Sequence, residues 1–546
     1  MQTTNTVFEA PRATRREWIG LGVLAIACVL YAMDLTVLHL AVPSLSADLQ
    51  PSSAQLLWII DIYGFLVAGS LITMGTLGDR IGRRKLLLIG AAAFGAASVL
   101  AALSTTAEML IAARALMGVA GATLAPSTLS LIFSMFRDPK QRSIAIGVWI
   151  TGFSSGAAIG PVLGGLLLEF FWWGSVFLMA LPVMALLLVL GPRVLPEFRD
   201  PNAGRLDLLS AGMSLVAILA VIYGLKATAQ DGLGLIPVLS VLGGLGIGTL
   251  FVRRQMTLAD PVIDIHLFRT PSFSASLATN VLSVFVAFGY FLFVAQYLQL
   301  VLGLTPLQAG LWSLPAAVGF IVGSNVAPRI MPRFRPAFVL GTCLVVAALG
   351  LGLLTQVGGP NGLAIVVAAS MVISLALAPV FSLTTELIVG SAPPERAGAA
   401  SGISETAAEL GGALGIAILG SIGVTIYRSG PANGLPAEVP TEAAAAARDT
   451  LGAALTIAQQ LPDGLGVALL EVARGAFVQG MQATSAISAV VAIGIAILAL
   501  VMLRHVPPSS QSQNQTNPHA QEQLPVAELT AAVEGPTATT SAKIVR

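Results

Sequence analysis

Two glutamates one helical turn apart are the side chains of this sequence best suited to carry protons. Glu405 and Glu409 lie within the otherwise apolar stretch SGISETAAELGGALG. A four-residue spacing places both side chains on one face of a helix. Two carboxylates that close cannot both be ionised cheaply in a low-dielectric cavity, so at least one is expected to hold a proton. We therefore predict a pair that carries a proton and, when ionised, binds a cation; a purely structural pair is the alternative.

Four of the other ionisable residues in apolar runs bear on function, because a charge there costs about 2.5–3.5 kcal/mol on insertion scales. Asp34 lies in the outer half of the first run, and Asp61 lies nearer the outer end of the second. Both are candidates for the proton or substrate site; the alternatives are a structural Asp34 bonded to hydroxyls and an Asp61 hydrated at the membrane surface. Arg114 is a buried cation that either organises the proton site or neutralises an acid. Glu386, near the end of its run, is expected at the membrane interface.

The composition indicates that a membrane surrounds these residues. Of the 546 residues, 55% are hydrophobic and 10% are charged, whereas soluble domains carry roughly 25% charged residues. A bilayer core about 30 Å thick requires about 20 apolar residues in a helix. Fourteen runs meet this requirement: 18–42, 56–77, 86–105, 109–133, 143–167, 174–192, 207–228, 234–252, 272–300, 307–328, 337–356, 362–388, 398–427 and 481–503.

Basic residues divide the connecting loops into two sets. With a cytoplasmic N-terminus, fourteen spans place every even-numbered loop in the cytoplasm, where Lys and Arg accumulate. Those loops and the two termini hold 23 of the 28 basic residues, and one span more or fewer would destroy this partition. We therefore predict an all-α polytopic protein of about fourteen transmembrane helices, multi-pass in the inner (plasma) membrane, with both termini cytoplasmic.

Two segments are predicted outside the membrane. Residues 428–480 contain an Ala-rich helical stretch, a turn at LPDG and a second helical stretch. This pattern predicts an extracytoplasmic hairpin, either a gate over the exit path or a solvated insertion. The polar, Pro- and Gln-rich tail 505–546 is predicted to be disordered and cytoplasmic. Cys28 and Cys343 lie in separate apolar runs, so neither a disulfide nor a metal site is expected.

The loop after the second span combines glycines, an acid and arginines in the spacing G-x-x-G-D-R-x-G-R-R. Glycines let helix ends approach closely, and an acid among arginines can form charge pairs that make and break as two halves rock. The segment resembles the signature loop of the major facilitator superfamily. Its residues are Gly75, Gly78, Asp79, Arg80, Gly82, Arg83 and Arg84.

Further motifs follow in the order expected for that family. The stretch RALMGVAG, which begins at Arg114, resembles the intramembrane arginine motif. The first span from Asp34 (DLTVLHLAVP) and the second around Asp61 (WIIDIYG) resemble the fourteen-span drug:proton antiporter branch of Qac and Smv type. In the fifth span, GFSSGAAIGPVLGG resembles the antiporter motif. Its residues are Gly152, Gly156, Gly160, Pro161, Gly164 and Gly165.

This resemblance implies an architecture and a mode of action. Two six-helix bundles, 18–192 and 272–504, would flank two inserted helices in 193–271, after a cytoplasmic N-terminus at 1–17. Substrate would bind near the membrane midplane, and rocking of the bundles would alternate access to it. The chain is expected to use the proton gradient without a cofactor and to act as a monomer in the lipid bilayer.

The substrates implied are lipophilic, mainly monovalent organic cations, such as quaternary ammonium compounds, dyes and drugs, exported in exchange for protons. Some relatives carry an extra acid in the tenth span, and its absence from SLPAAVGFIVGSNVAP argues against strong recognition of dications. A dedicated exporter of one metabolite or antibiotic and a transporter-like sensor remain as alternatives. An enzyme is not expected, because the sequence has no G-x-S-x-G, no Walker loop and no metal cluster. Nucleic acid is not an expected partner.

Overall fold

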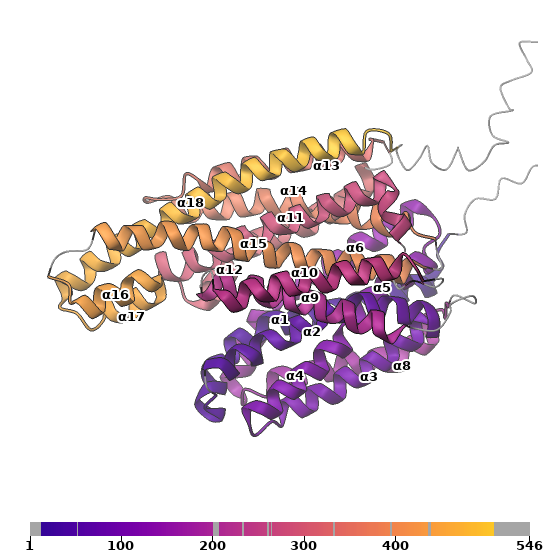
Figure 1. The fold of residues 1–546 in the computed structure, drawn as a ribbon, viewed down its shortest axis with the longest axis horizontal. Coiled ribbons are helices and arrows are strands. Elements are labelled where there is room, and N and C mark those ends of the chain that lie inside the picture. Colours follow the sequence, from indigo (N-terminus) through magenta and orange to yellow (C-terminus); the bar gives the residue numbers. More distant parts are fainter. Residues whose placement is uncertain are drawn as a thin grey trace, which may run out of the picture.

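The computed structural model describes residues 12–51, 53–199, 207–231, 234–258, 261, 263, 265–330, 333–393, 396–434 and 438–506. Within these ranges the chain forms helices joined by short connections (Figure 1). The first eight helices pack around one buried apolar core. They are α1 (Arg15–Leu49), α2 (Ser53–Ile81), α3 (Arg83–Ala102), α4 (Ala107–Gly121), α5 (Leu124–Met135), α6 (Pro139–Phe170), α7 (Ser175–Leu178) and α8 (Ala180–Val194).

The last helices pack around a second apolar core, and two helices lie between the groups in sequence. The two intervening helices are α9 (Leu208–Asp231) and α10 (Leu235–Gln255). The second group comprises α11 (Pro271–Gln296), η2 (Tyr297–Val301), α12 (Pro306–Ile330), α13 (Pro336–Leu354), α14 (Gly362–Gly390), α15 (Ala397–Gly434), α16 (Thr441–Asp449), α17 (Leu451–Ala458) and α18 (Asp463–Met502), after the short η1 (Ile265–Arg269). We call the first group the N-terminal half and the second group the C-terminal half.

The predicted all-α polytopic fold is confirmed. Twelve described stretches are long and apolar enough to cross a membrane. The remaining two predicted spans, the fifth and the seventh, correspond to α6 and α9, which are 32 and 24 residues long. Each of the fourteen predicted runs therefore lies on a described helix or on two helices in succession, and the chain is a multi-pass membrane protein.

Several boundaries differ from the sequence-based expectation. The fourth run is two helices, because the chain turns between α4 and α5 at Ala122 and Thr123. The thirteenth and fourteenth spans are longer than predicted, since α15 has 38 residues and α18 has 40. Residues 463–480, predicted as the second arm of a hairpin, form the start of α18. No proline interrupts this segment, so the helix of the last span extends through it.

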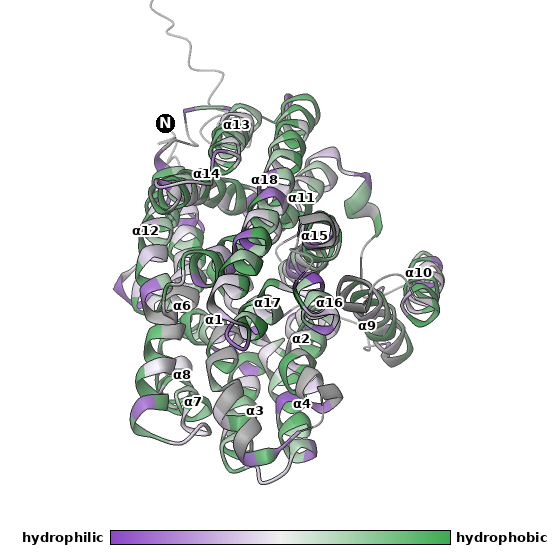
Figure 2. Cartoon of the chain, turned by 90° about the vertical axis from the view of Figure 1, so that its left-hand side faces the viewer, coloured by the Kyte–Doolittle hydropathy of each residue, from purple (hydrophilic) through white to green (hydrophobic). Residues whose placement is uncertain are grey.

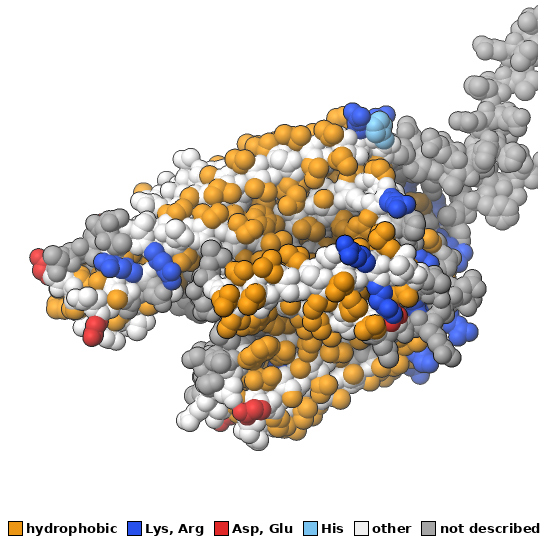
Figure 3. Space-filling model, in the orientation of Figure 1, with side chains coloured by type: hydrophobic (Ala, Val, Ile, Leu, Met, Phe, Trp, Pro, Cys, Tyr) orange, Lys and Arg blue, Asp and Glu red, His pale blue; other side chains and the backbone are white. Residues whose placement is uncertain are grey.

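The two ends of the helix bundle differ in charge and in shape. Lys and Arg side chains gather at one end, at the right of Figure 3, which we call the basic end. At the opposite end, Figure 3 shows the molecule hollowed between the N-terminal half and the α16–α17 region. Figure 2 looks onto this hollowed end and shows α9 and α10 set to one side of the two halves. The two halves are therefore closed against each other at the basic end and parted at the other.

Candidate functional site

The two glutamates of α15 lie where the two halves meet. Both side chains are partly buried, and the charges of Glu405 and Glu409 act on Tyr31 of α1 in the opposite half. Between the two glutamates, Thr406 approaches α2, with its hydroxyl 3.5 Å from the Ala68 carbonyl oxygen. Glu405 and Glu409 lie one helical turn apart on α15, so their side chains share one face of that helix. Two carboxylates in one partly buried position can exchange a proton or bind a cation.

Tyr31 belongs to a cluster of aromatic rings in the N-terminal half. The Tyr31 ring lies 5.5 Å from the Phe153 ring and 6.3 Å from the Tyr63 ring, measured between centroids. Phe153 in turn lies 4.7 Å from Trp149, whose indole N–H donates to the Thr128 hydroxyl at 2.9 Å. We call Tyr31, Tyr63, Trp149 and Phe153 the aromatic wall. Aromatic faces attract cations of varied shape by about 0.5–2 kcal/mol each.

Asp34, the other predicted carboxylate, is held by a fixed cation. An Arg114 Nη1–H donates to Asp34 Oδ2 at 2.7 Å, and the Arg114 Nε–H donates to the Ile59 carbonyl at 3.3 Å. The guanidinium also lies 4.6 Å above the Tyr63 ring. Arg114 is 1% exposed, and a buried charge needs such partners. The geometry shows Arg114 paired with an acid, and both roles predicted for it, organising the proton site and neutralising an acid, stay predictions.

A glycine of the arginine motif brings α4 close enough to α2 for these contacts. A Cβ at Gly118 would lie 2.7 Å from the Tyr63 carbonyl oxygen, closer than real Cβ atoms approach. Asp61 lies on α2 as predicted, but its side chain is outside the described residues. Its place in a cavity or at the hydrated surface therefore stays a prediction.

The signature loop joins the two halves at the basic end. Asp79 accepts backbone N–H bonds from Gly398 at 3.1 Å and Ala399 at 3.0 Å, in the first turn of α15. It also accepts from Arg83 Nε–H at 2.9 Å. A helix N-terminus carries unsatisfied N–H groups and a partial positive charge, which a carboxylate satisfies. We call Asp79, Arg83, Gly398 and Ala399 the latch.

Glycines at the latch allow the two helices to touch. A Cβ on Gly75 would collide with the Gly398 carbonyl, and a Cβ on Gly402 would lie 2.8 Å from the Leu71 carbonyl oxygen. Within the rest of the loop, Gly78 packs on Leu86. The remaining residues of the loop are placed as follows: Arg80 is half-buried at the end of α2, Gly82 has a positive φ of 111°, and Arg84 pairs with Glu197 at 3.5 Å.

The predicted antiporter motif is a helix-packing surface. A Cβ at Gly152 would lie 3.0 Å from the Ala25 carbonyl oxygen, and one at Gly156 would lie 2.9 Å from Ala32 Cβ. The motif thus holds α6 tightly against α1, the helix that carries Tyr31 and Asp34. Further along α6, Gly164 contacts Val37, Gly160 is buried, Gly165 faces open space, and the Pro161 side chain is outside the described residues.

Sequence reasoning missed a second contact between the halves at the basic end. The Ser143 hydroxyl, at the start of α6, donates to Glu386 Oε2 of α14 at 2.7 Å. Glu386 is therefore buried between the two halves, whereas the sequence predicted it at the membrane interface. The acid itself was visible in the sequence, but nothing near Ser143 marks it as a partner 243 residues away.

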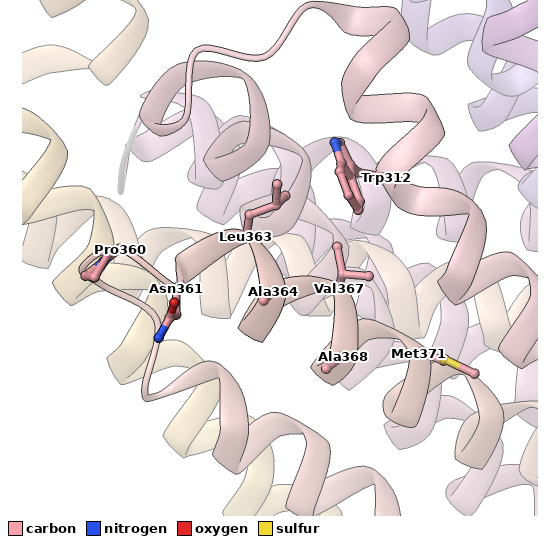
Figure 4. A pocket seen from close by; sticks show the side chains of 8 residues that line it. All are labelled: Trp312, Pro360, Asn361, Leu363, Ala364, Val367, Ala368 and Met371. Atoms are coloured by element: carbon pink, nitrogen blue, oxygen red, sulfur yellow. The ribbon is translucent and has the colours of Figure 1, made fainter.

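A groove near the hollowed end has a different character. It encloses about 470 Å³ between α12 and α14 (Figure 4). Trp312 and Met371 at its rim are 46% and 43% exposed, and in a membrane they would face lipid. The residues that line it are Trp312, Pro360, Asn361, Leu363, Ala364, Val367, Ala368 and Met371. This described lining contains no charged side chain, so it does not suit a cation.

Comparisons with known proteins agree with one another. The family described as Major Facilitator Superfamily matches residues 24–416. The chain is 42% identical over 493 residues to "Multidrug efflux pump LfrA" of Mycolicibacterium smegmatis, covering 90% of this chain and 97% of that one. It is 37% identical over 472 residues to "Methyl viologen resistance protein SmvA" of Salmonella typhimurium, covering 85% and 93%. It is 32% identical over 495 residues to "Tetracenomycin C resistance and export protein" of Streptomyces glaucescens, covering 89% and 91%.

Solved structures share the fold. The human organic anion transporter MFSD10 (TETRAN) superposes with a TM-score of 0.58 at 15% identity, covering 89% of this chain and 99% of that one. An inward-facing, unoccupied bacterial homolog of the human lysosomal transporter Spinster gives 0.54 at 20% identity, covering 90% and 98%. At these identities the likeness concerns the fold alone.

Proposed function

The chain belongs to the major facilitator superfamily and is a membrane transporter rather than an enzyme, and from that premise we propose that it is a proton-coupled exporter of lipophilic organic cations. The observation that carries this proposal is the position of Glu405 and Glu409, between the two halves and opposite the aromatic wall. A site that binds a lipophilic cation needs a negative charge and aromatic faces. A proton competes for the same charge.

The proposed exchange uses the glutamate pair as its switch. When the pair is ionised it holds a cation against Tyr31 and Phe153. Protons arriving from outside neutralise the pair and release the cation to that side. Asp34 is already neutralised by Arg114 at 2.7 Å, so in this proposal it shapes the field around Tyr63 and does not compete for the substrate.

Alternating access follows from the difference between the two ends. The latch and the Ser143–Glu386 bond close the basic end, and the molecule is hollowed at the other (Figure 3). By the positive-inside rule the basic end, with both termini, faces the cytoplasm in the plasma membrane. In this proposal, the conformation with a closed basic end is the one from which a cation leaves and protons enter. Rocking about the midplane would open the basic end for reloading.

The membrane potential favours this exchange when more than one proton enters per monovalent cation exported. Each elementary charge that crosses the membrane is worth about 2.3 kcal/mol per 100 mV. Two exchangeable carboxylates, Glu405 and Glu409, would allow two protons per cycle, so export of a monovalent cation would draw on both voltage and the pH gradient.

Proton release upon substrate binding tests the proposal. Purified protein in detergent at low buffer capacity is titrated with tetraphenylphosphonium, a lipophilic monovalent cation, while a pH indicator is monitored. Wild type is expected to release protons, and the double variant Glu405→Gln/Glu409→Gln is expected to release none. Glu169→Gln serves as the matched control, because Glu169 lies exposed at the outer end of α6. Undiminished proton release by the double variant would contradict the proposal.

The range of substrates that bind distinguishes a polyspecific exporter from an exporter dedicated to one metabolite. Similarity to a multidrug efflux pump favours a polyspecific exporter, and similarity to a methyl viologen resistance protein makes a planar dication the sharpest competitor to test. Similarity to a tetracenomycin C exporter favours instead a dedicated exporter of one metabolite. Competition by many unrelated cations for bound tetraphenylphosphonium would support the first, and competition by none the second. Counterflow in proteoliposomes would exclude a sensor that binds without transport.

A further inference from the structure

A short segment after α8 lies against the latch loop. The Phe198 carbonyl accepts the backbone N–H of Arg83 at 3.0 Å, and Glu197 Oε1 accepts the backbone N–H of Arg84 at 3.1 Å. The Arg84 guanidinium also donates to the Leu195 and Pro192 carbonyls at 3.0 and 3.3 Å. The last two residues of the signature loop, Arg83 and Arg84, are thus bonded to the chain that leaves the N-terminal half.

These bonds satisfy the N-terminus of α3. The first N–H groups of a helix have no partner within it, and the residue before α3 is Gly82, which has no side chain to cap them. Glu197 and the Phe198 carbonyl take that role from a distant segment, and the Glu197 carboxylate suits the positive end of the helix dipole. A Cβ on Gly82 would lie 2.6 Å from Glu197 Oε1, so the segment fits only against glycine.

The same segment holds the side chain that completes the latch. The Arg83 guanidinium lies 4.7 Å from the centroid of the Phe198 ring. On its other sides it donates to Asp79 at 2.9 Å and to the Ser130 carbonyl at 3.2 Å. Arg83 is 1% exposed, so its orientation is determined by these contacts. A line of contacts therefore runs from Phe198 through Arg83 and Asp79 to the N-terminus of α15.

The helix that follows this segment in the chain packs along the same junction. On α9, Leu215 contacts Gly69 of α2. Ile222 of α9 is buried in one cluster with Phe65 of α2 and Ala413 of α15. Thus α9 covers the line where α2 and α15 meet (Figure 2). The segment and α9 both act on the two helices that the latch joins.

We propose that Phe198 and Glu197 are positioning residues for the closed basic end. They fix Arg83 on Asp79, and together with the inserted helix α9 they brace the cytoplasmic gate. The inference rests on the proposed alternating access. It does not depend on which acids carry protons.

The test measures the opening of the basic end directly. Spin labels are placed on cysteines at Lys140 of α6 and Arg329 of α12, both exposed and on opposite halves at the basic end, after Cys28 and Cys343 are replaced by alanine. Double electron–electron resonance in proteoliposomes then gives the populations of the short, closed distance and the long, open one.

Three variants separate a positioning role from a merely structural one. Phe198→Leu removes the ring over Arg83 and is expected to raise the open population about three- to tenfold. Phe198→Tyr retains the ring and is expected to show the wild-type distribution of distances between the labels. Glu197→Gln retains a cap without charge and should give an intermediate shift. Phe170→Leu, an exposed aromatic at the far end of α6, is the matched control.

The outcomes are distinct from those of the proton-release test. An unchanged distance distribution in both Phe198→Leu and Glu197→Gln overturns this inference, even if the glutamate double variant abolishes proton release. An equal shift in Phe198→Tyr and Phe198→Leu also overturns it, because the ring would then be irrelevant. If Phe198→Leu does not fold, Glu197→Gln alone decides. If a variant loses proton coupling, the distance between the spin labels still tests this inference.

Discussion

Two intramembrane acidic sites of this protein differ in what faces their carboxylates. Asp34 of α1 faces the guanidinium of Arg114 at 2.7 Å. Glu405 of α15 lies one helical turn from another carboxylate, that of Glu409. The first arrangement fixes a charge within the N-terminal half and neutralises it. The second leaves negative charge at the junction of the halves for a mobile cation or a proton. The two acids are thus similarly buried and differ in the sign of the neighbouring charge.

The largest expected effect is loss of the fixed pair. Arg114→Ala would leave Asp34 in a buried position without its cation, and breaking a buried ion pair costs about 3–5 kcal/mol. We expect poor yield or a strongly lowered melting temperature in detergent, measured by intrinsic fluorescence. The double variant Arg114→Met/Asp34→Leu should recover most of the stability, since apolar replacement of both partners is often neutral. A stable Arg114→Ala single variant would contradict the structural role of the pair.

Removing one charge from the glutamate site should have the opposite effect on stability. Glu405→Gln removes one of two neighbouring carboxylates that cannot both be ionised cheaply, so the melting temperature should be unchanged or raised. Function should suffer, with roughly half the protons released per cation bound. Parallel melting and proton-release measurements on this variant provide the check. A fall in stability as large as that of Arg114→Ala would mean that both acidic sites are structural.

Which of these features the sequence could predict depends on how far apart the residues concerned lie along the chain. The spacing of Glu405 and Glu409 placed both on one helix face, because a four-residue period is a local property. Bilayer thickness likewise sets the length of each apolar run, so the spans were predictable. The partner of Asp34 was not, since Arg114 lies 80 residues away and only the packing of α4 against α2 brings it close. The sequence offered two roles for Arg114, and tertiary structure was needed to identify its partner.

The latch shows the same limit. Its glycines and charges were recognisable from their spacing, yet the groups that Asp79 binds are backbone N–H groups 319 and 320 residues away. Backbone donors carry no sequence signal. The Phe198 carbonyl that accepts from Arg83 was equally invisible. Contacts made through the backbone, or to a serine such as Ser143, therefore had to come from the structure.

A smaller effect is expected where glycine is the only residue that fits the latch. Gly398→Ala would place a Cβ 2.6 Å from the Gly75 carbonyl oxygen and against the Asp79 carboxylate. Overpacking of this kind costs about 1–3 kcal/mol, which would shift the closed–open equilibrium by about 5- to 150-fold toward opening of the basic end. The distance between labels at Lys140 and Arg329 reports it. Gly494→Ala on α18, where a Cβ meets nothing within 4 Å, should leave the distribution unchanged.

The smallest effect is expected for an acid–arginine pair near the ends of α9 and α10. This pair contrasts with the buried pair of Asp34 and Arg114. Asp207 accepts from the Ser210 hydroxyl at 2.7 Å and pairs with Arg254 at 2.8 Å, near the ends of α9 and α10. The Ser210 hydrogen bond and then Arg254 lower the pKa of Asp207 below its usual value, which is about 3.9. The ionised form is favoured by folding, so its stabilisation is complete above the usual pKa and is lost as pH falls through the lowered one.

Exposed pairs contribute about 0.2–1 kcal/mol. Asp207→Asn should therefore lower the melting temperature slightly and equally from pH 8 to pH 5, with the difference from wild type shrinking only below about pH 4. A pH-dependent difference near neutrality would contradict the lowered pKa of Asp207.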